Sequence, residues 1–508
     1  MEESSDLWFL VRRLNQIGIA LSAEHSLGKL LEMIVSELRA FTHSDGGSLY
    51  IKKGDVLSFE VAQNDTLAKR LGKVPFKSFT IPIDHQSIAG YVASTGNPIN
   101  IPDFDKVGDD VPYSLTTMRD FDGKMGLKTV SMLVVPMRNH KDEIIGVVQL
   151  LNSLDSEGNP VPYNPWMEEL VSSLASQAAM AITNSVLIAD IKQLFESLVT
   201  YSAQAIDARS PHTAGHSLRV SKLVIRQVEV INDTKEGPFA EVTFSEEEMN
   251  ELRMAAWLHD IGKIGVREHV LDKVNMLSDD RIAAITARFD YLKKDYENRR
   301  NERKLKLLAG ESTSRETVEE IDRETVQAVA ELDAELAHIL KLNKPSFRSD
   351  DDIAFLKHIA GKTYNDPGGM ERPFLEPGEL SHLLVRKGNL TEEERAEIQS
   401  HVHHTLNILE KIPFTQELWN IPRFAAAHHE MLDGSGYPNR LRSDQIPLQS
   451  RIIAVADIFD ALTAKDRPYK PPLPLAVALR IIREDAEAGK LDRDLVELFI
   501  SREIFSAI

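Results

Sequence analysis

Histidine and aspartate side chains in the second half of this 508-residue chain have the types and spacing of metal ligands. His259 and Asp260 are adjacent at the end of an apolar run, Met254–Leu258, where burying both polar groups is costly without a bound partner. His428 and His429 form a second adjacent pair, and ordinary cores rarely bury two imidazoles side by side. Twelve of the 16 histidines lie after residue 211. This pattern predicts a metal centre in the second half of the chain.

The chain has no cysteine, which excludes disulfides, thiolate nucleophiles and iron–sulfur clusters and leaves His, Asp and Glu as metal ligands. Such ligand mixtures suit Fe, Mn or Zn. Asp260 can offer one oxygen to each of two ions, and two ions suit in-line attack of water on phosphorus. Lys263 follows His259 by four residues and Asp260 by three, so its ammonium shares their helical face and would meet a bound anion. Phosphodiester hydrolysis is the predicted reaction.

The elements of the first half predict a mixed α/β domain. Apolar residues have helical spacing from about residue 10 to 41, with Ser26 as a helix N-cap. Strand-like runs follow at 46–62, near 80, near 132 and at 143–152. We expect an antiparallel sheet with helices on one face.

A long helix is predicted from about Pro165 to Arg209, because this stretch contains no glycine and no further proline. Apolar residues along it follow a 4-3-4-3-4 spacing, which is typical of one coiled-coil seam. Pairing of two chains into a parallel dimer and packing of the helix onto its own chain both fit this pattern. The seam residues are Leu187, Ile191, Leu194, Leu198, Tyr201 and Ala205.

Residues 275–385 form a charge-rich segment with helical apolar spacing that is broken near Gly310, so we expect a helical hairpin with a solvated face. The stretch 362–379 has the Pro and Gly residues of a loop.

The first half resembles a GAF sensor domain over about residues 20–190. The resemblance implies the fold and leaves the ligand open, because Ser153 and Trp166–Glu169 stand where cyclic-nucleotide-binding members carry their signature. A ligand sensor and a domain used only for packing or dimerisation are both consistent with it. The matching segments are Ile88–Ala93, Thr95–Gly96, Pro98–Ile101, Asp103, Ile144–Asn152 and Ala178–Asn184.

The second half resembles an HD-GYP domain, the cyclic di-GMP phosphodiesterase branch of the HD phosphohydrolases, over about residues 205–274 and 386–500. The segment His428–Pro438 contains the motif that names the family, and His259–Lys263 is its His-Asp-Ile-Gly-Lys string. The resemblance implies two divalent metals, Fe or Mn first. The implied ligands are His216, His259, Asp260, His401, His428, His429 and Asp457, with His212 as an accessory candidate.

Substrate contacts also follow from this resemblance. Asp260 and Lys263 are the implied catalytic residues. His403 and His404 compete with His401, which we favour for its spacing to Ile408. The insertion at 275–385 departs from the compact family, and we expect it near the mouth of the site, where it would gate or select substrate. The implied substrate-binding residues are Lys263, Gly436, Tyr437, Pro438, Arg467 and Lys470, with Gly434 shaping their loop.

The predicted function is metal-dependent hydrolysis of cyclic di-GMP to linear pGpG, GMP or both, under control of the GAF domain. The alternatives are a catalytically silent receptor or adaptor and a hydrolase of another cyclic dinucleotide. We expect a multidomain chain whose C-terminal domain is all-α. Its predicted parts are a helix start at 1–19, the GAF domain at 20–164, a linker helix at 165–205 and the HD-GYP domain at 206–500.

Composition and charge bear on partners and location. The net charge is −19, from 78 acidic and 59 basic residues, which argues against general affinity for DNA or anionic membranes. The acidic N-terminus lacks the features of a signal peptide, and we expect no segment that approaches a membrane span. A cytoplasmic homodimer joined through the linker helix is the resulting prediction.

Overall fold

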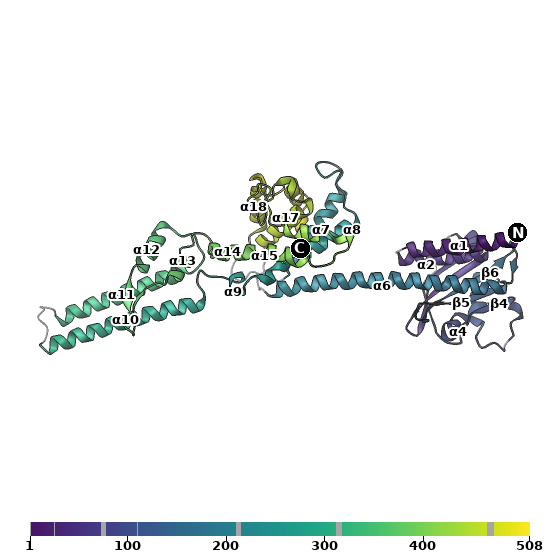
Figure 1. Ribbon diagram of the computed structural model, residues 1–508, viewed down its shortest axis with the longest axis horizontal. Helices are drawn as coiled ribbons and strands as arrows, with labels where there is room; N and C mark the ends of the chain where they lie inside the picture. Colours follow the sequence, from purple (N-terminus) through teal and green to yellow (C-terminus); the bar gives the residue numbers. More distant parts are fainter. Residues whose placement is uncertain are drawn as a thin grey trace. The chain divides into compact units, whose positions relative to one another are not determined.

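The computed structural model divides the chain into two compact units, Met1–Phe195 and Glu196–Ile508 (Figure 1). Each unit is described by itself below. Side chains of residues 2–11 are not described. The residues that the structure describes are 2–24, 26–72, 78–108, 110–209, 215–310, 317–464 and 472–508.

The first unit contains an antiparallel sheet in the order β3-β2-β1-β6-β5-β4, with β7 paired to β6. The expected strands near 46–62, 80, 132 and 143–152 are all present, and Gly54, at φ +62°, makes the tight turn between the first two. The strands are β1 Ser44–Lys53, β2 Val56–Asn64, β3 Thr80–Pro82, β4 Ile99–Ile101, β5 Met132–Arg138, β6 Ile144–Leu154 and β7 Pro160–Val161.

Helices cover both faces of this sheet, so the expectation of helices on one face was wrong. One face packs on α1 (Glu2–Ala23), α2 (Leu27–Thr42) and the start of α6 (Pro165–Arg209). The other face packs on α4 (Ile88–Thr95) and the start of α5 (Thr116–Met125). The reason is that β5 and β6 are apolar on both sides, and each apolar side must be buried. The short helix α3 covers Asp65–Leu71.

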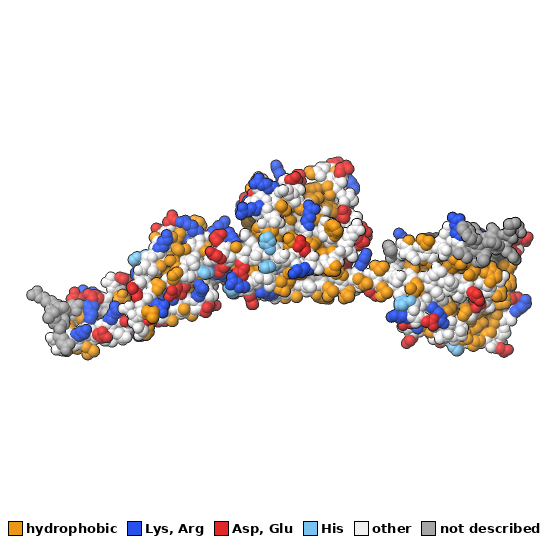
Figure 2. Space-filling model, in the orientation of Figure 1, with side chains coloured by type: hydrophobic (Ala, Val, Ile, Leu, Met, Phe, Trp, Pro, Cys, Tyr) orange, Lys and Arg blue, Asp and Glu red, His pale blue; other side chains and the backbone are white. Residues whose placement is uncertain are grey.

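Helix α6 is continuous over 45 residues, as its lack of glycine predicts. Its first turns bury Val171, Leu174 and Ala178 in the core of the first unit. The predicted seam is exposed in the middle of the helix, where Figure 2 shows a run of hydrophobic side chains. The exposed fractions are 49% for Leu187, 65% for Ile191, 61% for Leu194, 58% for Leu198 and 68% for Tyr201.

By length and apolar composition alone, α6 also passes the test for a helix that could cross a membrane, because an 18-residue window within it has a mean hydropathy of 1.3. A single helix that passes this test is weak evidence for a membrane span. Core helices pass the same test, and the first turns of α6 are packed against the sheet.

The second unit is built mainly from helices, most of which surround an apolar core. Buried residues recur along α7 (His216–Asp233) at helical spacing, and a Ser245–Glu248 capping box starts α8 (Glu246–Leu258). Further helices are η2 Ile261–Gly265, α9 Glu268–Leu271, α14 Glu392–Gln399, α15 His401–Leu409, η3 Gln416–Leu418, α16 Ile421–Ala426, η4 Ser443–Gln445, α17 Leu448–Thr463, α18 Leu475–Glu487, α19 Arg493–Ser501 and η5 Ile504–Ala507.

The expected hairpin within 275–385 is present as α10 (Asp279–Leu308) and α11 (Val318–Leu342), which run antiparallel (Figure 1). Ion pairs Lys293–Asp333 and Lys304–Asp322 join them. The stretch predicted as loop contains a two-stranded sheet, so the second unit is not wholly helical. Its elements are α12 Asp350–Ala360, β8 Thr363–Asn365, β9 Glu371–Pro373 and α13 Pro377–Leu383.

Candidate metal centre

The predicted metal ligands come from separate segments of the second unit and meet in its interior. His216 is the first residue of α7, and His401 is the first residue of α15. His259 and Asp260 follow the end of α8, and Asp457 lies within α17. His428 and His429 lie just after α16. Six of these seven side chains are buried, and His429 is partly buried: the buried ones are His216, His259, Asp260, His401, His428 and Asp457.

One group of ligand atoms surrounds His216. Its Nε2 lies 3.3 Å from His259 Nε2, 3.2 Å from Asp457 Oδ1 and 3.4 Å from Asp260 Oδ2. Nitrogen and oxygen atoms of His216, His259 and Asp457 all lie within 4.8 Å of one another, a spacing that a single cation can span.

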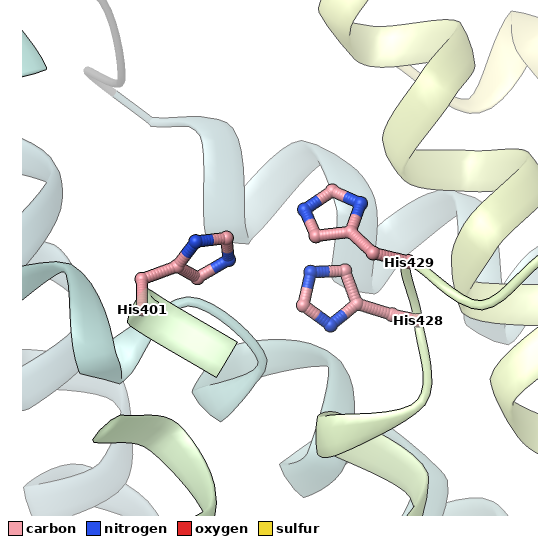
Figure 3. Close-up of side chains that lie close together, drawn as sticks. All are labelled: His401, His428 and His429. Carbon is pink, nitrogen blue, oxygen red and sulfur yellow. The ribbon is translucent and has the colours of Figure 1, made fainter. Parts of the chain in front are cut away.

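A second group lies on the other side of Asp260. His401 Nε2 is 3.3 Å and His428 Nε2 is 4.0 Å from Asp260 Oδ1. Figure 3 shows the ring of His401 facing those of His428 and His429, which come from a different segment. The two oxygens of Asp260 therefore face two different groups of imidazoles, which suits a carboxylate shared by two ions.

Backbone carbonyls orient three of these imidazoles. In each, Nδ1 lies within hydrogen-bond distance of the carbonyl oxygen three residues earlier. A carbonyl can only accept, so Nδ1 carries the proton and Nε2 keeps its lone pair for a metal. The three contacts are His259 Nδ1 to Ala256 O at 2.7 Å, His401 Nδ1 to Ile398 O at 2.7 Å and His428 Nδ1 to Ala425 O at 2.6 Å.

Among the described residues, three buried atoms in the centre have no hydrogen-bond partner: Asp260 Oδ1, His401 Nε2 and His428 Nε2. Leaving a buried polar atom unpaired costs about 1–3 kcal/mol. All three are acceptors and they converge, so a cation satisfies them together, whereas a hydrogen-bond donor satisfies one or two. The residues present therefore fit divalent metals.

The protonation states fit the same interpretation. Burial lowers the pKa of His429 to about 4, so its ring is neutral and free to bind a metal near pH 7. Burial also lowers the pKa of His216, but its contacts with Asp260, Asp457 and Asp460 raise that pKa well above the usual value. The three carboxylates therefore stabilise positive charge at the position of His216, as they would stabilise a bound cation.

Lys263 lies beside the ligands. Its Nζ is 2.5 Å from Asp260 Oδ2. Burial lowers the pKa of this ammonium, but the contact with the charged Asp260 raises it by more. The pKa of Lys263 therefore lies above its ordinary value. Lys263 is therefore a permanent positive charge at the metal centre.

Asp460 also belongs to the site. Its carboxylate accepts from His216 Nδ1 at 2.7 Å and from Arg219 Nε at 2.6 Å. It lies one turn after Asp457 on the buried face of α17, and this i, i+3 spacing is the signal that predicts it. Asp460 orients His216 as the carbonyls orient the other rings.

The packing of α15 on the turn after Asp260 depends on two residues that the sequence prediction missed. Thr405 Oγ1 donates to the carbonyl of His259 at 3.0 Å and accepts from the N–H of Gly262 at 3.0 Å. A Cβ at position 262 would collide with the carbonyl of His401 and the nitrogen of Thr405. Glycine here is what lets the two ligand-bearing segments approach.

The competing histidines lie outside the centre. His403 is exposed, and His404 is partly exposed and packs against Gly265. His401, in contrast, is buried with its Nε2 among the ligand atoms.

The loop predicted to contact substrate borders the centre. The ring of Tyr437 lies 4.8 Å from that of His429, and Pro438 is partly buried. Gly436 packs directly on the backbone of His429–Met431, leaving no space for a side chain, and Gly434 has φ +80°. The predicted residues His212, Arg467 and Lys470 lie outside the described residues.

Comparison with protein families identifies domains of two kinds. A GAF domain model matches residues 26–182, and two HD domain models match residues 213–339 and 374–495. Together with the sheet and the metal centre, these matches define the class of the protein: the chain contains a GAF domain followed by an HD domain.

Curated relatives match part of the chain. The 3'3'-cGAMP-specific phosphodiesterase 3 of Vibrio cholerae is 44% identical over 109 residues, 21% of this chain and 23% of that protein. The 3'3'-cGAMP-specific phosphodiesterase 1 of the same organism is 35% identical over 174 residues, 34% and 36% of the two chains. The cyclic di-GMP phosphodiesterase of Thermotoga maritima is 40% identical over 124 residues, 24% and 32%. The matched region spans only about a quarter to a third of these relatives.

Proposed function

We propose that this protein hydrolyses a phosphodiester bond of cyclic di-GMP, giving pGpG, GMP or both. The observation that carries the proposal is the buried Asp260 carboxylate, whose two oxygens face two separate groups of imidazoles. A pair of metal sites that share a carboxylate suits attack of water on a phosphodiester. The names of the relatives support a cyclic dinucleotide as the substrate.

The predicted ligands would hold two divalent ions, with Fe or Mn expected first. When bound, these ions supply a nucleophilic water at neutral pH and stabilise charge on the phosphoryl oxygens. Asp260 would serve both ions. The first ion's ligands would be His216, His259 and Asp457, and the second ion's would be His401, His428 and His429.

Lys263 would neutralise a non-bridging phosphoryl oxygen, because phosphoryl transfer depends mainly on positioning and charge stabilisation. Its ammonium is already held at the centre by Asp260. Tyr437 offers an aromatic face beside His429 for a base or ribose. Arg467 and Lys470 remain predicted contacts for the second phosphate.

A second candidate substrate is 3'3'-cGAMP. The specific observation in its favour is that relatives at 44% and 43% identity carry that substrate in their names. Both nucleotides present the same two phosphodiesters, so the metal centre serves either one, and the choice would depend on contacts to a single base.

Regulation by the GAF domain is part of the proposal. A partly open cavity of about 110 Å³, lined by the sheet and by residues of α3, α4 and α5, is mostly apolar. Tyr50 and Gln149 line it and are more than nine-tenths buried, and the hydroxyl of Tyr50 has no hydrogen bond among the described residues. A small, largely apolar ligand with one polar group would fit this lining. In this proposal, residues 165–205 form the linker between the GAF domain and the catalytic domain.

We also propose a homodimer that pairs through α6. The spacing of its exposed seam is that of a coiled coil, and chains paired along it would bury Ile191, Leu194 and Leu198. A cytoplasmic location is proposed with it. Light scattering on the purified chain tests the dimer, and a monomer would exclude it.

The experiment that tests the enzymatic proposal is an assay of the purified full chain, loaded with Fe or Mn under reducing conditions. Cyclic di-GMP and 3'3'-cGAMP are supplied separately, and products are separated by chromatography. Turnover of cyclic di-GMP supports the first candidate, and turnover of 3'3'-cGAMP alone supports the second. Binding of either nucleotide without turnover would make the protein a receptor and overturn the enzymatic proposal.

A further inference from the structure

The last turn of α6 contacts two of the segments that supply metal ligands. Asp207 lies in this turn with only 3% of its surface exposed. Its carboxylate accepts two hydrogen bonds from Ser217, one from the backbone N–H at 3.0 Å and one from Oγ at 3.1 Å. Ser217 directly follows His216 at the start of α7.

Asp207 does for α7 what an N-cap side chain normally does. The first N–H groups of a helix have no partner within the helix, and a side chain at the N-cap usually accepts one of them. The N-cap of α7 is Gly215, which has no side chain to do this. Asp207 supplies the acceptor from another helix, and its negative charge lies at the positive end of α7. This contact fixes the turn that carries His216.

Arg209 makes the matching contact with the turn after Asp260. Its Nη1 donates to the carbonyls of Lys263 at 3.1 Å and Ile264 at 2.9 Å, and its Nη2 donates to that of Val266 at 2.9 Å. These carbonyls lie at the C-terminal end of η2, where a cation is favourable. Arg209 thereby fixes the turn that follows Asp260 and carries Lys263.

We propose that Asp207 and Arg209 are positioning residues of the metal centre. Asp207 holds the segment that carries His216, and Arg209 holds the segment that carries Asp260 and Lys263. Together they set the distance between these two segments, which lie far apart in the sequence. Asp207 and Arg209 both belong to the helix whose first turns are buried in the GAF domain. The inference rests on the proposed function, because it assumes that metals bind here.

The test is Mn²⁺ binding to the metal-free full chain, measured by calorimetry and by the electron paramagnetic resonance spectrum of bound Mn²⁺. The variants are Asp207→Asn and Arg209→Ala. Loss of an orienting contact typically costs 10–100-fold in metal affinity, so we expect weakening of about that size and a changed spectrum. Arg209→Lys, which keeps the charge but not the fork of donors, should recover part of the loss.

Arg483→Ala is the matched control. It removes an exposed arginine of α18 that forms an ion pair with Glu497 of α19. Its Mn²⁺ affinity should equal that of the unaltered chain. Melting curves in chelator identify any variant that fails to fold, in which case Arg209→Lys still tests the inference. Affinities within twofold of the unaltered chain for both main variants would overturn it. Absence of Mn²⁺ binding by the unaltered chain would instead overturn the proposed function.

Discussion

The two units bury polar groups in opposite ways. In the GAF domain, polar side chains such as Tyr50, Gln149 and Ser87 are scattered over a mostly apolar cavity lining, and little there selects one ligand chemistry. In the described part of the HD domain, seven ligand side chains converge, and three of their acceptor atoms have no hydrogen-bond partner. Convergent buried acceptors therefore specify a chemistry, whereas an apolar cavity specifies only a size. This difference explains why a reaction can be proposed for the second unit and only a ligand class for the first.

The largest effect is expected from Asp260→Asn. The amide keeps one oxygen but replaces the other with a donor that cannot bind a metal, so one of the two sites loses a ligand. We expect turnover to fall by more than the roughly 100-fold typical of outer contacts, together with loss of bound metal. Metal content and steady-state kinetics check this, with the exposed Asp494→Asn as the control. If the metal content of Asp260→Asn were normal, the inference that the buried acceptors of the second unit specify a metal site would be wrong.

A smaller effect is expected from Asp460→Asn, which weakens the hydrogen bond that orients His216 Nδ1. Metal affinity should fall by about 10–100-fold while the fold is retained. Titration with Mn²⁺ measures it. An affinity equal to that of the unaltered chain would mean that His216 needs no orienting carboxylate.

Gly262→Ala tests the close packing behind the ligands. The added Cβ meets the backbone of α15, and overpacking of this kind costs about 1–3 kcal/mol. Gly28→Ala is the matched control in the first unit, because nothing lies within 4 Å of its added Cβ and alanine favours the helix. Thermal melting in chelator should show a lower melting temperature for Gly262→Ala than for the unaltered chain. The melting temperature of Gly28→Ala should not be lowered. Equal melting curves would contradict the packing argument.

The smallest effect concerns the GAF cavity. Tyr50→Phe removes a hydroxyl that has no hydrogen bond among the described residues, so the free energy of unfolding should stay within about 0.5 kcal/mol or rise. Tyr163→Phe, the control, removes a buried hydroxyl bonded to Ser44 Oγ at 2.7 Å and should lower it by about 1 kcal/mol. Urea unfolding distinguishes the two variants. A large loss from Tyr50→Phe would mean that its hydroxyl already has a partner and is not available to a ligand.

Much of the architecture was predictable because it depends on local pattern. The absence of glycine and proline predicts α6, and the break at Gly310 predicts the hairpin of α10 and α11. The two errors in the fold have different causes. The helices on the second face of the sheet pack on strands far along the chain, which local periodicity does not reveal. The strands β8 and β9 form a local hairpin, but each is only three residues long, too short for an alternating pattern to show.

The sequence by itself determined which residue types are available to bind a metal: with no cysteine, only His, Asp and Glu remain, and their adjacent pairs mark the centre. Only the tertiary structure decided how they are used. It turned the two oxygens of Asp260 toward different imidazoles, brought Thr405 against Gly262, and set Asp207 and Arg209 against the ligand-bearing turns. The physical reason is distance along the chain, since contacts between residues about ten to 250 positions apart follow from packing of the whole domain and from no local spacing.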